Sequence, residues 1–212
     1  MMAHYFTTPD GPENRSELEV EIRGRRVRVV TAAGVFSPGA LDKGTAVLLD
    51  AVPDPLGAEF LDLGCGWGPV TLALGFSGRA DGERDDARPR VTSVDVNERS
   101  LALTRDNAAA YSVTAEAYLP QEVPEDRRFD VIWSNPPIRI GKEALRELLL
   151  LWLPRLTPGG EAWLVVQKNL GADSLQTWLT RALPEATGEP WSVTRDSTSK
   201  GFRVLRVSRT SR

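Results

Sequence analysis

The stretch Phe60-Leu61-Asp62-Leu63-Gly64-Cys65-Gly66-Trp67-Gly68 decides the fold of this 212-residue chain. Its first four residues, Phe60 to Leu63, predict a buried strand, and the glycines at alternate positions after them predict a sharp turn. Glycine also lets a ligand approach the main chain closely. A strand that runs into such a turn is typical of nucleotide-binding α/β sheets, so we expect an α/β fold.

A second predicted strand ends at a polar edge. The apolar run Phe129-Asp130-Val131-Ile132-Trp133-Ser134 is followed directly by Asn135-Pro136-Pro137-Ile138. An asparagine followed by two prolines places a side-chain amide and a rigid carbonyl at the carboxyl end of the strand. Open α/β sheets bind ligands at this edge, so we expect the glycine turn and the Asn135 segment to share one site.

The rest of the chain alternates predicted strands and helices, which favours a mainly parallel sheet covered on both faces. No helix fits between Arg195 and Phe202, so the last two strands should form an antiparallel hairpin. We therefore expect a single Rossmann-like domain with a seven-stranded, mainly parallel sheet whose last strand is antiparallel. The strands are expected at 60–63, 91–95, 113–117, 130–134, 162–166, 192–195 and 202–207, and the helices at 46–51, 70–74, 98–110, 142–152 and 172–182.

The N-terminal part has a different pattern. Residues 1–17 are polar and rich in turn formers, so we expect a flexible leader. Residues 18–22 and 27–31 alternate apolar and charged side chains about a glycine-containing turn, which predicts a β-hairpin. The expected domain therefore covers residues 18–212, with the hairpin at 18–33.

Composition bounds the class of protein. Hydrophobic residues make up 41% and charged residues 26%, as in soluble globular proteins, and no apolar run is long enough to span a membrane. The single cysteine, Cys65, excludes an internal disulfide and fits a cytoplasmic protein. A net charge of -3 argues against a whole-surface grip on nucleic acid, so a polyanion would need a local patch. The patch at 23–28, rich in arginine, is either such a site or the solvated face of the hairpin.

The first half of the expected site suits a nucleoside cofactor. Asp95 ends the strand after the glycine turn, where an acidic residue accepts hydrogen bonds from ribose hydroxyls. A ligand with a ribose and no phosphate is S-adenosylmethionine, and Asp62 is placed to meet its ammonium group. The alternative is a tight strand-to-helix corner without a ligand. Cys65 is expected to pack rather than to act as a nucleophile, because His4 is the only histidine available as a base.

The second half suits a planar amine. An exocyclic amine of guanine or adenine is a poor nucleophile because its lone pair is delocalised into the ring. The side-chain oxygen of Asn135 and the carbonyl of Pro136 can accept its two hydrogens and direct the lone pair at an incoming methyl group, without a general base. Ile138 then offers an apolar contact to the base. The alternative is that Asn135-Pro136-Pro137 merely ends a strand.

These motifs resemble those of class I S-adenosylmethionine-dependent methyltransferases. The segments 34–37, 41–45, 135–139, 165–168 and 200–205 narrow the resemblance to the small-domain group, which contains ribosomal RNA guanine-N2 methyltransferases of RsmC type. The resemblance implies that S-adenosylmethionine is bound by one set of residues and that the methyl is transferred at Asn135, Pro136, Pro137 and Ile138. The implied cofactor-binding residues are Phe36, Thr45, Asp62, Gly64, Cys65, Gly66, Gly68, Asp95, Val96 and Asn135, with Glu116 as the candidate for the adenine amino group.

The leading hypothesis is therefore methylation of guanine N2 in RNA of the small ribosomal subunit. Adenine N6 and a protein glutamine amide are alternative acceptors for the same site, and a non-catalytic cofactor-binding module is a further alternative. A nicotinamide oxidoreductase is disfavoured because the third glycine of the turn comes too early and the sheet should end in a hairpin. No metal is expected, and a monomer and a homodimer are both left open. Candidate RNA-binding residues are Arg25, Arg26, Arg28, Arg139 and Lys200.

Overall fold

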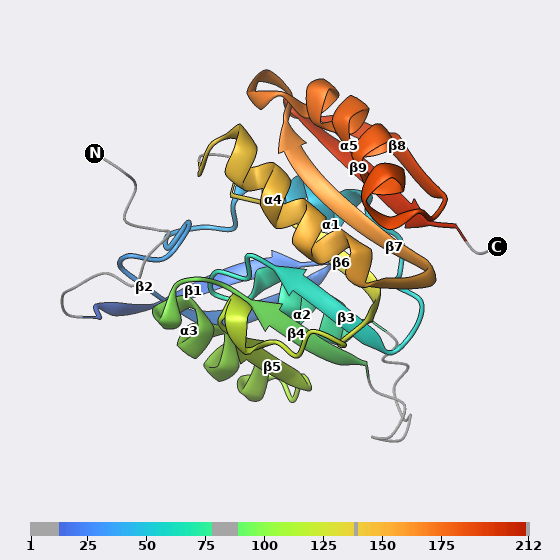
Figure 1. Ribbon diagram of the computed structural model, residues 1–212. Coiled ribbons are helices and arrows are strands. Elements are labelled where there is room, and N and C mark those ends of the chain that lie inside the picture. Colours follow the sequence, from blue (N-terminus) through green and yellow to red (C-terminus); the bar gives the residue numbers. More distant parts are fainter. Residues whose placement is uncertain (1–12, 78–88, 138–139, 211–212) are drawn as a thin grey trace.

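A computed structural model of the chain describes residues 13–77, 89–137 and 140–210. Its main feature is a seven-stranded sheet in the order β5-β4-β3-β6-β7-β9-β8, accompanied by a separate two-stranded hairpin, β1-β2 (Figure 1). The strands are β1 Arg15–Ile22, β2 Arg25–Ala32, β3 Glu59–Leu63, β4 Arg90–Val94, β5 Ala115–Tyr118, β6 Phe129–Ser134, β7 Leu156–Gln167, β8 Trp191–Ser199 and β9 Phe202–Arg209.

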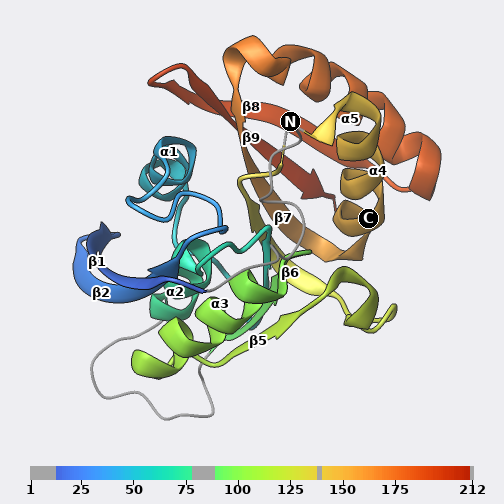
Figure 2. The same ribbon diagram turned by 90° about the vertical axis from the view of Figure 1, so that its left-hand side faces the viewer.

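Helices cover both faces of this sheet (Figures 1 and 2). The helices α1, α2 and α3 contribute to one hydrophobic core together with the hairpin, and α4 and α5 contribute to the other. Within the described residues, no helix has the length and apolar character needed to cross a membrane. The helices are α1 Lys43–Ala51, α2 Pro69–Phe76, α3 Glu98–Ala110, α4 Lys142–Trp152 and α5 Ala172–Thr187, with short 3-10 turns at η3 Pro120–Glu122, η5 Leu153–Arg155 and η6 Lys168–Leu170.

The strand directions confirm the predicted fold class. Strands β3 to β7 pair in parallel, and β9 lies between β7 and β8, antiparallel to both. Because β9 is reversed, it starts at the sheet edge where the parallel strands end. The carboxyl ends of β3, β4, β6 and β7 and the start of β9 therefore meet at one edge.

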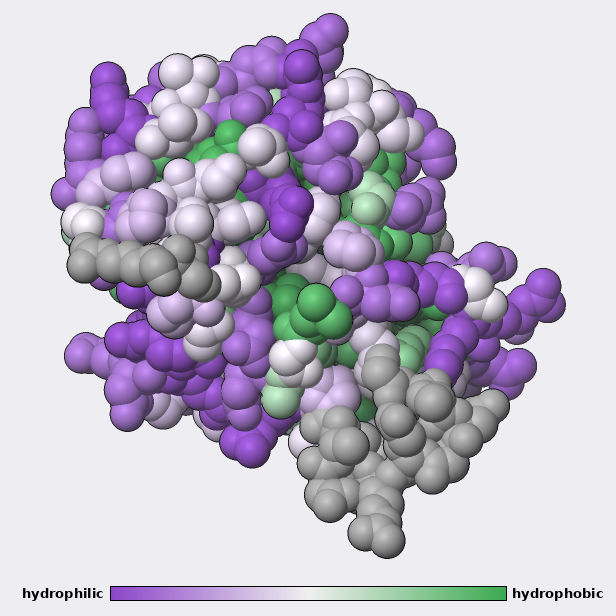
Figure 3. All heavy atoms as spheres, turned by 90° about the vertical axis from the view of Figure 1, so that its right-hand side faces the viewer, coloured by the Kyte–Doolittle hydropathy of each residue, from purple (hydrophilic) through white to green (hydrophobic). Residues whose placement is uncertain are grey.

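The two cores follow from side-chain alternation along the strands. Phe60 faces the core on the α1–α3 side, whereas the next residue, Leu61, faces the core on the α4–α5 side. On α4 the buried residues Leu145, Leu149 and Trp152 recur at spacings of four and three, which is the apolar stripe of an amphipathic helix. Outside these cores the surface is mostly hydrophilic on the side seen in Figure 3, with hydrophobic residues visible in several small areas.

Some predicted boundaries need correction. Strand β1 begins at Arg15 and pairs with Ala32, so residues 15–17 belong to the hairpin and not to a flexible leader. Residues 1–12 lie outside the described part of the chain. Helix α1 begins at Lys43, three residues before the prediction, because the Asp42 side chain caps it by accepting from the backbone N–H groups of Gly44 and Thr45.

Candidate active site

A cavity of about 240 Å³ opens at the carboxyl edge of the sheet. The glycine turn and the Asn135 segment, which are 71 residues apart from Gly64 to Asn135, both line it, as the sequence predicted. A smaller hollow next to it is lined by Thr45 and Cys65 in addition to shared residues. The predicted residues that line the main cavity are Phe36, Gly64, Gly66, Asp95, Val96, Asn135, Pro136 and Pro137.

The glycine turn brings backbone to the cavity surface. Gly64 and Gly66 have φ angles of 85° and 57°, in the left-handed region that favours glycine. A Cβ atom built on Gly66 would meet nothing within 4 Å, so this glycine leaves open space at the cavity wall. Gly68 has a different role from the one predicted: it does not line the cavity, and its added Cβ would lie 3.2–3.3 Å from Thr104 of α3. It therefore allows close helix packing.

Asp95 holds the turn from the side. Its Oδ2 accepts from Gly66 N at 3.0 Å, and its Oδ1 accepts from Asn97 N at 2.9 Å. Burial raises the pKa of Asp95 above its ordinary value, and hydrogen bonds from the backbone N–H groups of Gly66, Asn97 and Val96 oppose this rise. Each carboxylate oxygen keeps acceptor capacity toward the cavity, which suits a pair of ribose hydroxyls.

Phe36 lies over the turn on a loop that three side chains anchor. Asn97 Nδ2 donates to Gly34 O at 2.9 Å, Arg99 Nη1 donates to Ala33 O at 2.6 Å, and Trp67 Nε1 donates to Ser37 O at 3.3 Å. The Phe36 ring nevertheless remains 48% exposed at the cavity. It offers an apolar face to a ligand in the cavity.

The amide of Asn135 has a fixed orientation. Its Nδ2 donates to Asp42 Oδ2 at 2.8 Å and lies 3.0 Å from Thr45 Oγ1. A carboxylate only accepts hydrogen bonds, so the nitrogen of the amide must face Asp42. The side-chain oxygen is then left as an acceptor at the cavity.

A close-packed triangle maintains this orientation. A Cβ atom built on Gly44 would lie 3.0 Å from both Asp42 Oδ2 and Phe202 Cε1, and 3.3 Å from Asn135 Nδ2. Because Gly44 has no Cβ atom, the side chains of Asp42, Asn135 and Phe202 can pack close together beside it. Asp42 is at once the cap of α1 and the acceptor for the side-chain amide of Asn135.

Pro136 supplies the second acceptor. It lines the cavity, and in the described residues no backbone N–H donates to its carbonyl, whereas the Pro137 carbonyl accepts from Ile140 N at 3.1 Å. The proline ring fixes φ, so the carbonyl has little freedom. Ile138 and Arg139, the other predicted residues of this segment, lie outside the described part of the chain.

The lining fits a nucleoside cofactor. The open space at Gly66 admits a ligand against the main chain, the Asp95 carboxylate suits a ribose, and Phe36, Val96 and Pro120 offer apolar contacts to a base. When bound, S-adenosylmethionine supplies a methyl group already activated on a sulfonium.

Comparison with known proteins decides the family. Residues 26–205 match the family model of the methyltransferase small domain. The chain belongs to this family. It is an S-adenosylmethionine-dependent methyltransferase, which confirms the resemblance drawn from the motifs.

The relatives of this methyltransferase include RNA-modifying enzymes. It is 31% identical to the uncharacterized protein YbxB of Bacillus subtilis, over 82% of this chain and 86% of that protein. It is 34% identical to ribosomal RNA small subunit methyltransferase C of Chromohalobacter salexigens, over 84% of this chain and 50% of that protein. The T. thermophilus 16S rRNA N2 methyltransferase RsmC, solved with AdoMet and guanosine, aligns with a TM-score of 0.73 at 25% identity, over 96% of this chain and 52% of that one. The methyltransferase thus spans about half the length of these two RNA enzymes.

Asp62 of the methyltransferase does not lie where the sequence analysis placed it. The side chain is 1% exposed, does not line the cavity, and accepts from Thr71 Oγ1 at 2.6 Å beneath the turn. Its Oδ1 has no hydrogen-bond partner in the described residues. Burial raises the pKa of Asp62 to about 7, and the Thr71 hydrogen bonds oppose this. Asp62 supports the turn from inside the fold.

Cys65 is a packing residue, as expected. Its side chain is buried, and its sulfur accepts a hydrogen bond from Thr104 Oγ1 at 3.3 Å. Burial, with smaller contributions from the negative charges of Asp95 and Asp62, raises the pKa of the Cys65 thiol well above its ordinary value. A neutral buried thiol is a poor nucleophile.

The prediction for Glu116 is wrong. Its Oε2 accepts from Arg127 Nη1 at 2.9 Å at the outer edge of the sheet, and the residue does not line the cavity. Neighbouring residues on a strand face opposite sides, and on β5 it is Ala117 that turns inward. The chain reaches the cavity three residues further on, at Pro120.

The arginines of the hairpin are also far from the cavity. Helices α2 and α3 both start at the cavity side, at Gly68 and Asn97. The Arg25 guanidinium lies 5.0 Å from the ring of Phe76 at the opposite end of α2. Helix α3 has 13 residues and so is about 20 Å long.

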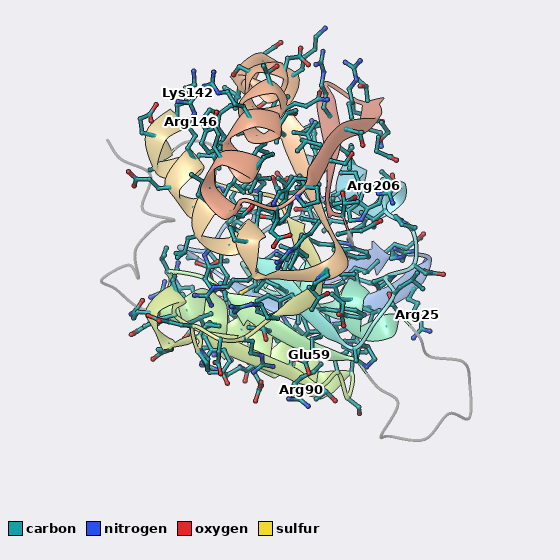
Figure 4. The ribbon with its side chains drawn as sticks, turned by 45° about the vertical axis from the view of Figure 1, so that its right-hand side comes forward. Arg25, Glu59, Arg90, Lys142, Arg146 and Arg206 are labelled. Atoms are coloured by element: carbon teal, nitrogen blue, oxygen red, sulfur yellow. The ribbon has the colours of Figure 1, made fainter. Side chains whose placement is uncertain are left out.

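Tyr111, directly after α3, donates its hydroxyl hydrogen to Arg28 O at 3.0 Å. Arg25, Arg26 and Arg28 therefore lie at the end of the molecule away from the cavity, and Figure 4 shows Arg25 far from Lys142. The prediction that these arginines bind RNA therefore concerns a surface away from the cavity, and it stays a prediction. Lys200 differs from them, because it precedes the cavity-lining Phe202 by two residues at the β8–β9 turn.

Several site residues were not predicted as such. Asp42 was not predicted as a site residue, because its contact with the cavity depends on Asn135, which is 93 residues away. Gln167 and Phe202 occur in segments that resemble the family, and the rule that ligands bind at carboxyl ends of strands would have selected Gln167. The other unpredicted lining residues are Leu63, Val94, Pro120, Leu148 and Leu170.

Proposed function

We propose that this methyltransferase transfers a methyl group to the exocyclic N2 amine of a guanine in ribosomal RNA of the small subunit. The observation that carries the proposal is the fixed amide of Asn135, whose nitrogen is bound by Asp42 and Thr45. The amide oxygen is thereby left to accept a hydrogen bond from a substrate amine.

The chemistry requires two acceptors and no base before transfer. The Asn135 oxygen and the Pro136 carbonyl accept the two N–H hydrogens of a planar amine, which draws the nitrogen toward tetrahedral geometry and frees its lone pair. The nitrogen would take up the methyl group as the bond between the methyl carbon and the sulfonium sulfur breaks, with S-adenosylhomocysteine as the leaving group, and the methylated amine would then lose a proton to water. Because both acceptors are held in place before the substrate arrives, they stabilise the developing positive charge without reorganisation.

The cavity walls suit a flat base beside the acceptors. Phe202, Leu148 and Leu170 supply apolar surface to the cavity, and the exposed side chain of Gln167 offers both a donor and an acceptor. An apolar slot with one amide is a suitable environment for a purine edge. The RNA substrates of the relatives RsmC and methyltransferase C support RNA as the source of the base.

The test is methylation of ribosomal RNA from cells that lack this gene. The protein is incubated with labelled S-adenosylmethionine and either naked small-subunit RNA or intact small subunits, and the RNA is digested to nucleosides for mass spectrometry. N2-methylguanosine that is absent with Asn135→Ala supports the proposal. Label in N6-methyladenosine, in a protein glutamine or in no acceptor contradicts it.

A further inference from the structure

The lysines of this chain have an uneven distribution. Lysine and arginine together number 26, of which only four are lysines. All four lie at segments that border the cavity edge: Lys43 starts α1 directly after Asp42, Lys168 follows Gln167, Lys200 precedes Phe202 by two residues, and Lys142 starts α4, the helix that carries Leu148.

Two of these segments are in direct contact. Lys168 N donates to Gly201 O at 2.9 Å, so the end of β7 and the turn between β8 and β9 lie side by side. Lys168 and Lys200 are thus close neighbours on the cavity rim. Figure 4 shows Lys142 at the start of α4, on the far side of the molecule from Arg25 and Arg90.

The lysines also differ from the arginines in their partners. All four lysines are exposed, and none of them forms an ion pair with another described residue. Many arginines, in contrast, face a carboxylate, as Arg26 faces Glu19 and Arg127 faces Glu59 and Glu116. An unpaired lysine keeps a mobile ammonium group that can meet a phosphate as a point charge.

Exposed apolar side chains line the same cavity. Phe36, Val96 and Leu170 are 48%, 48% and 50% exposed, and all three line the cavity. Only five large hydrophobic side chains are exposed in the described residues, so most of them gather here. Exposed apolar surface that is gathered at one opening indicates a contact site rather than chance exposure.

We propose that the four lysines form a collar that binds the phosphates flanking an unpaired nucleotide, while the part of the cavity at Leu148, Leu170 and Phe202 admits its base. This inference rests on the proposed function and names the form of RNA that the site accepts. A base within a duplex would first have to be flipped out of its stack, whereas single-stranded segments present splayed bases directly. Because the net charge of the chain is -3, RNA would have to be bound by a local group of basic residues such as this collar.

The experiment compares two matched pairs of substitutions. Lys168→Ala/Lys200→Ala removes two charges from the collar, and Arg128→Ala/Arg181→Ala removes two exposed charges at the start of β6 and on α5. Binding of a fluorescent single-stranded RNA containing guanosine, and of the same sequence as a blunt duplex, is measured by anisotropy across a range of salt. Calorimetry with S-adenosylhomocysteine checks that each variant keeps its fold.

The collar variant should bind the single strand about tenfold more weakly and lower the slope of log K against log salt by about 1.4, since each phosphate contact contributes about 0.7 for single strands. The control pair should stay within about twofold of wild type. A second pair, Lys43→Ala/Lys142→Ala, should weaken binding in the same direction. Equal losses in the lysine and control pairs, or tighter binding of the duplex, would overturn the collar.

The outcome for the collar is separable from that for the proposed function. If the wild type methylates ribosomal RNA but the lysine pairs have no effect on RNA binding, the collar is wrong and the function stands. If the wild type binds S-adenosylhomocysteine but no RNA at low salt, the collar is wrong and RNA is excluded as its partner. If it binds RNA through the lysines and methylates only adenine, the collar stands and the guanine assignment fails.

Discussion

The carboxyl edge of the sheet and the β1–β2 hairpin both contain sequence motifs that suggest function, but their polar residues have different partners in the folded protein. At the edge, Asn135, Asp42 and Thr45 come together from segments about 90 residues apart. At the hairpin, Arg26 and Arg28 face Glu19 and Glu17 across the strands, 3.6 and 3.9 Å apart. The charges at the hairpin are largely compensated within it, whereas the amide at the edge keeps an acceptor for a ligand. A run of basic residues is therefore weaker evidence for a ligand-binding site than a polar side chain that keeps one hydrogen-bonding atom free for a ligand.

Replacing Asn135 should have the largest effect. Asn135→Ala removes one of the two acceptors, so the rate of methyl transfer should fall by about 10²–10³, as for the loss of one pre-positioned group in a catalytic site. Affinity for S-adenosylhomocysteine should change only a few-fold, roughly within the 1 kcal/mol of a neutral hydrogen bond. Single-turnover kinetics and calorimetry measure the two quantities. Equal losses in both would mean that Asn135 binds the cofactor rather than the acceptor.

The buried Asp62 should make stability depend on pH. Its pKa of about 7 lies above the ordinary 3.8, so the folded state holds the proton more tightly than the unfolded state. Its contribution to the free energy of unfolding is full below about pH 4, falls as the pH rises to about 7, and then stays constant, a loss of at most about 4 kcal/mol.

Asp62→Asn keeps an acceptor oxygen for Thr71 and cannot ionise. The variant should therefore be more stable than wild type at pH 8. Its free energy of unfolding, measured with urea in the absence of cofactor, should also change less between pH 4.5 and 7. Identical profiles for the two proteins would show that Asp62 is not the group that titrates.

Asp95 should control cofactor binding. Asp95→Ala removes the carboxylate that braces Gly66 N and that would accept from a ribose. Loss of charged hydrogen bonds of about 1.5–3 kcal/mol corresponds to a decrease in S-adenosylhomocysteine affinity of about 10–100-fold. Calorimetry measures it, and an unchanged affinity would remove Asp95 from the cofactor site.

Asp42 should act through Asn135. Asp42→Asn preserves a good helix cap, but its amide no longer requires the Asn135 nitrogen to face it. We expect the rate of transfer to fall by about tenfold, less than for Asn135→Ala, with little change in thermal stability. In the double variant with Asn135→Ala the Asp42 substitution should have no further effect on rate. Additive losses would indicate a separate role for Asp42.

Substitutions in the hairpin should have the smallest effect. Arg25→Ala/Arg26→Ala removes one cation–π contact and one exposed ion pair, which together contribute about 1 kcal/mol or less to stability. RNA affinity and turnover should stay within about twofold of wild type, since both side chains are far from the cavity. A large loss of RNA binding would instead give the hairpin a role in holding the substrate.

The fold was predictable because its signals are local. The glycine turn after Phe60–Leu63, the repeated strand–helix order and the missing helix before Phe202 each depend on neighbouring residues. The positions of Gly64, Gly66, Asp95 and Asn135 at one edge followed from the parallel sheet. Glu116 was misplaced because a shift of one residue in a strand reverses the side chain to the other face. Such a register is set by pairing with β4, not by the sequence of β5 alone.

The sequence by itself determined the succession of strands and helices along the chain, the cofactor turn and the amide at the end of β6, because each is encoded by spacing within a few residues. Only the tertiary structure decided which polar side chains keep a hydrogen-bonding atom available to a ligand. Asp42 and Gly44 orient the Asn135 amide, Thr71 holds Asp62 beneath the turn, and the lengths of α2 and α3 keep the hairpin arginines from the cavity. The physical reason is that hydrogen-bond partners are set by proximity in space, and contacts between distant segments form only when the sheet is assembled.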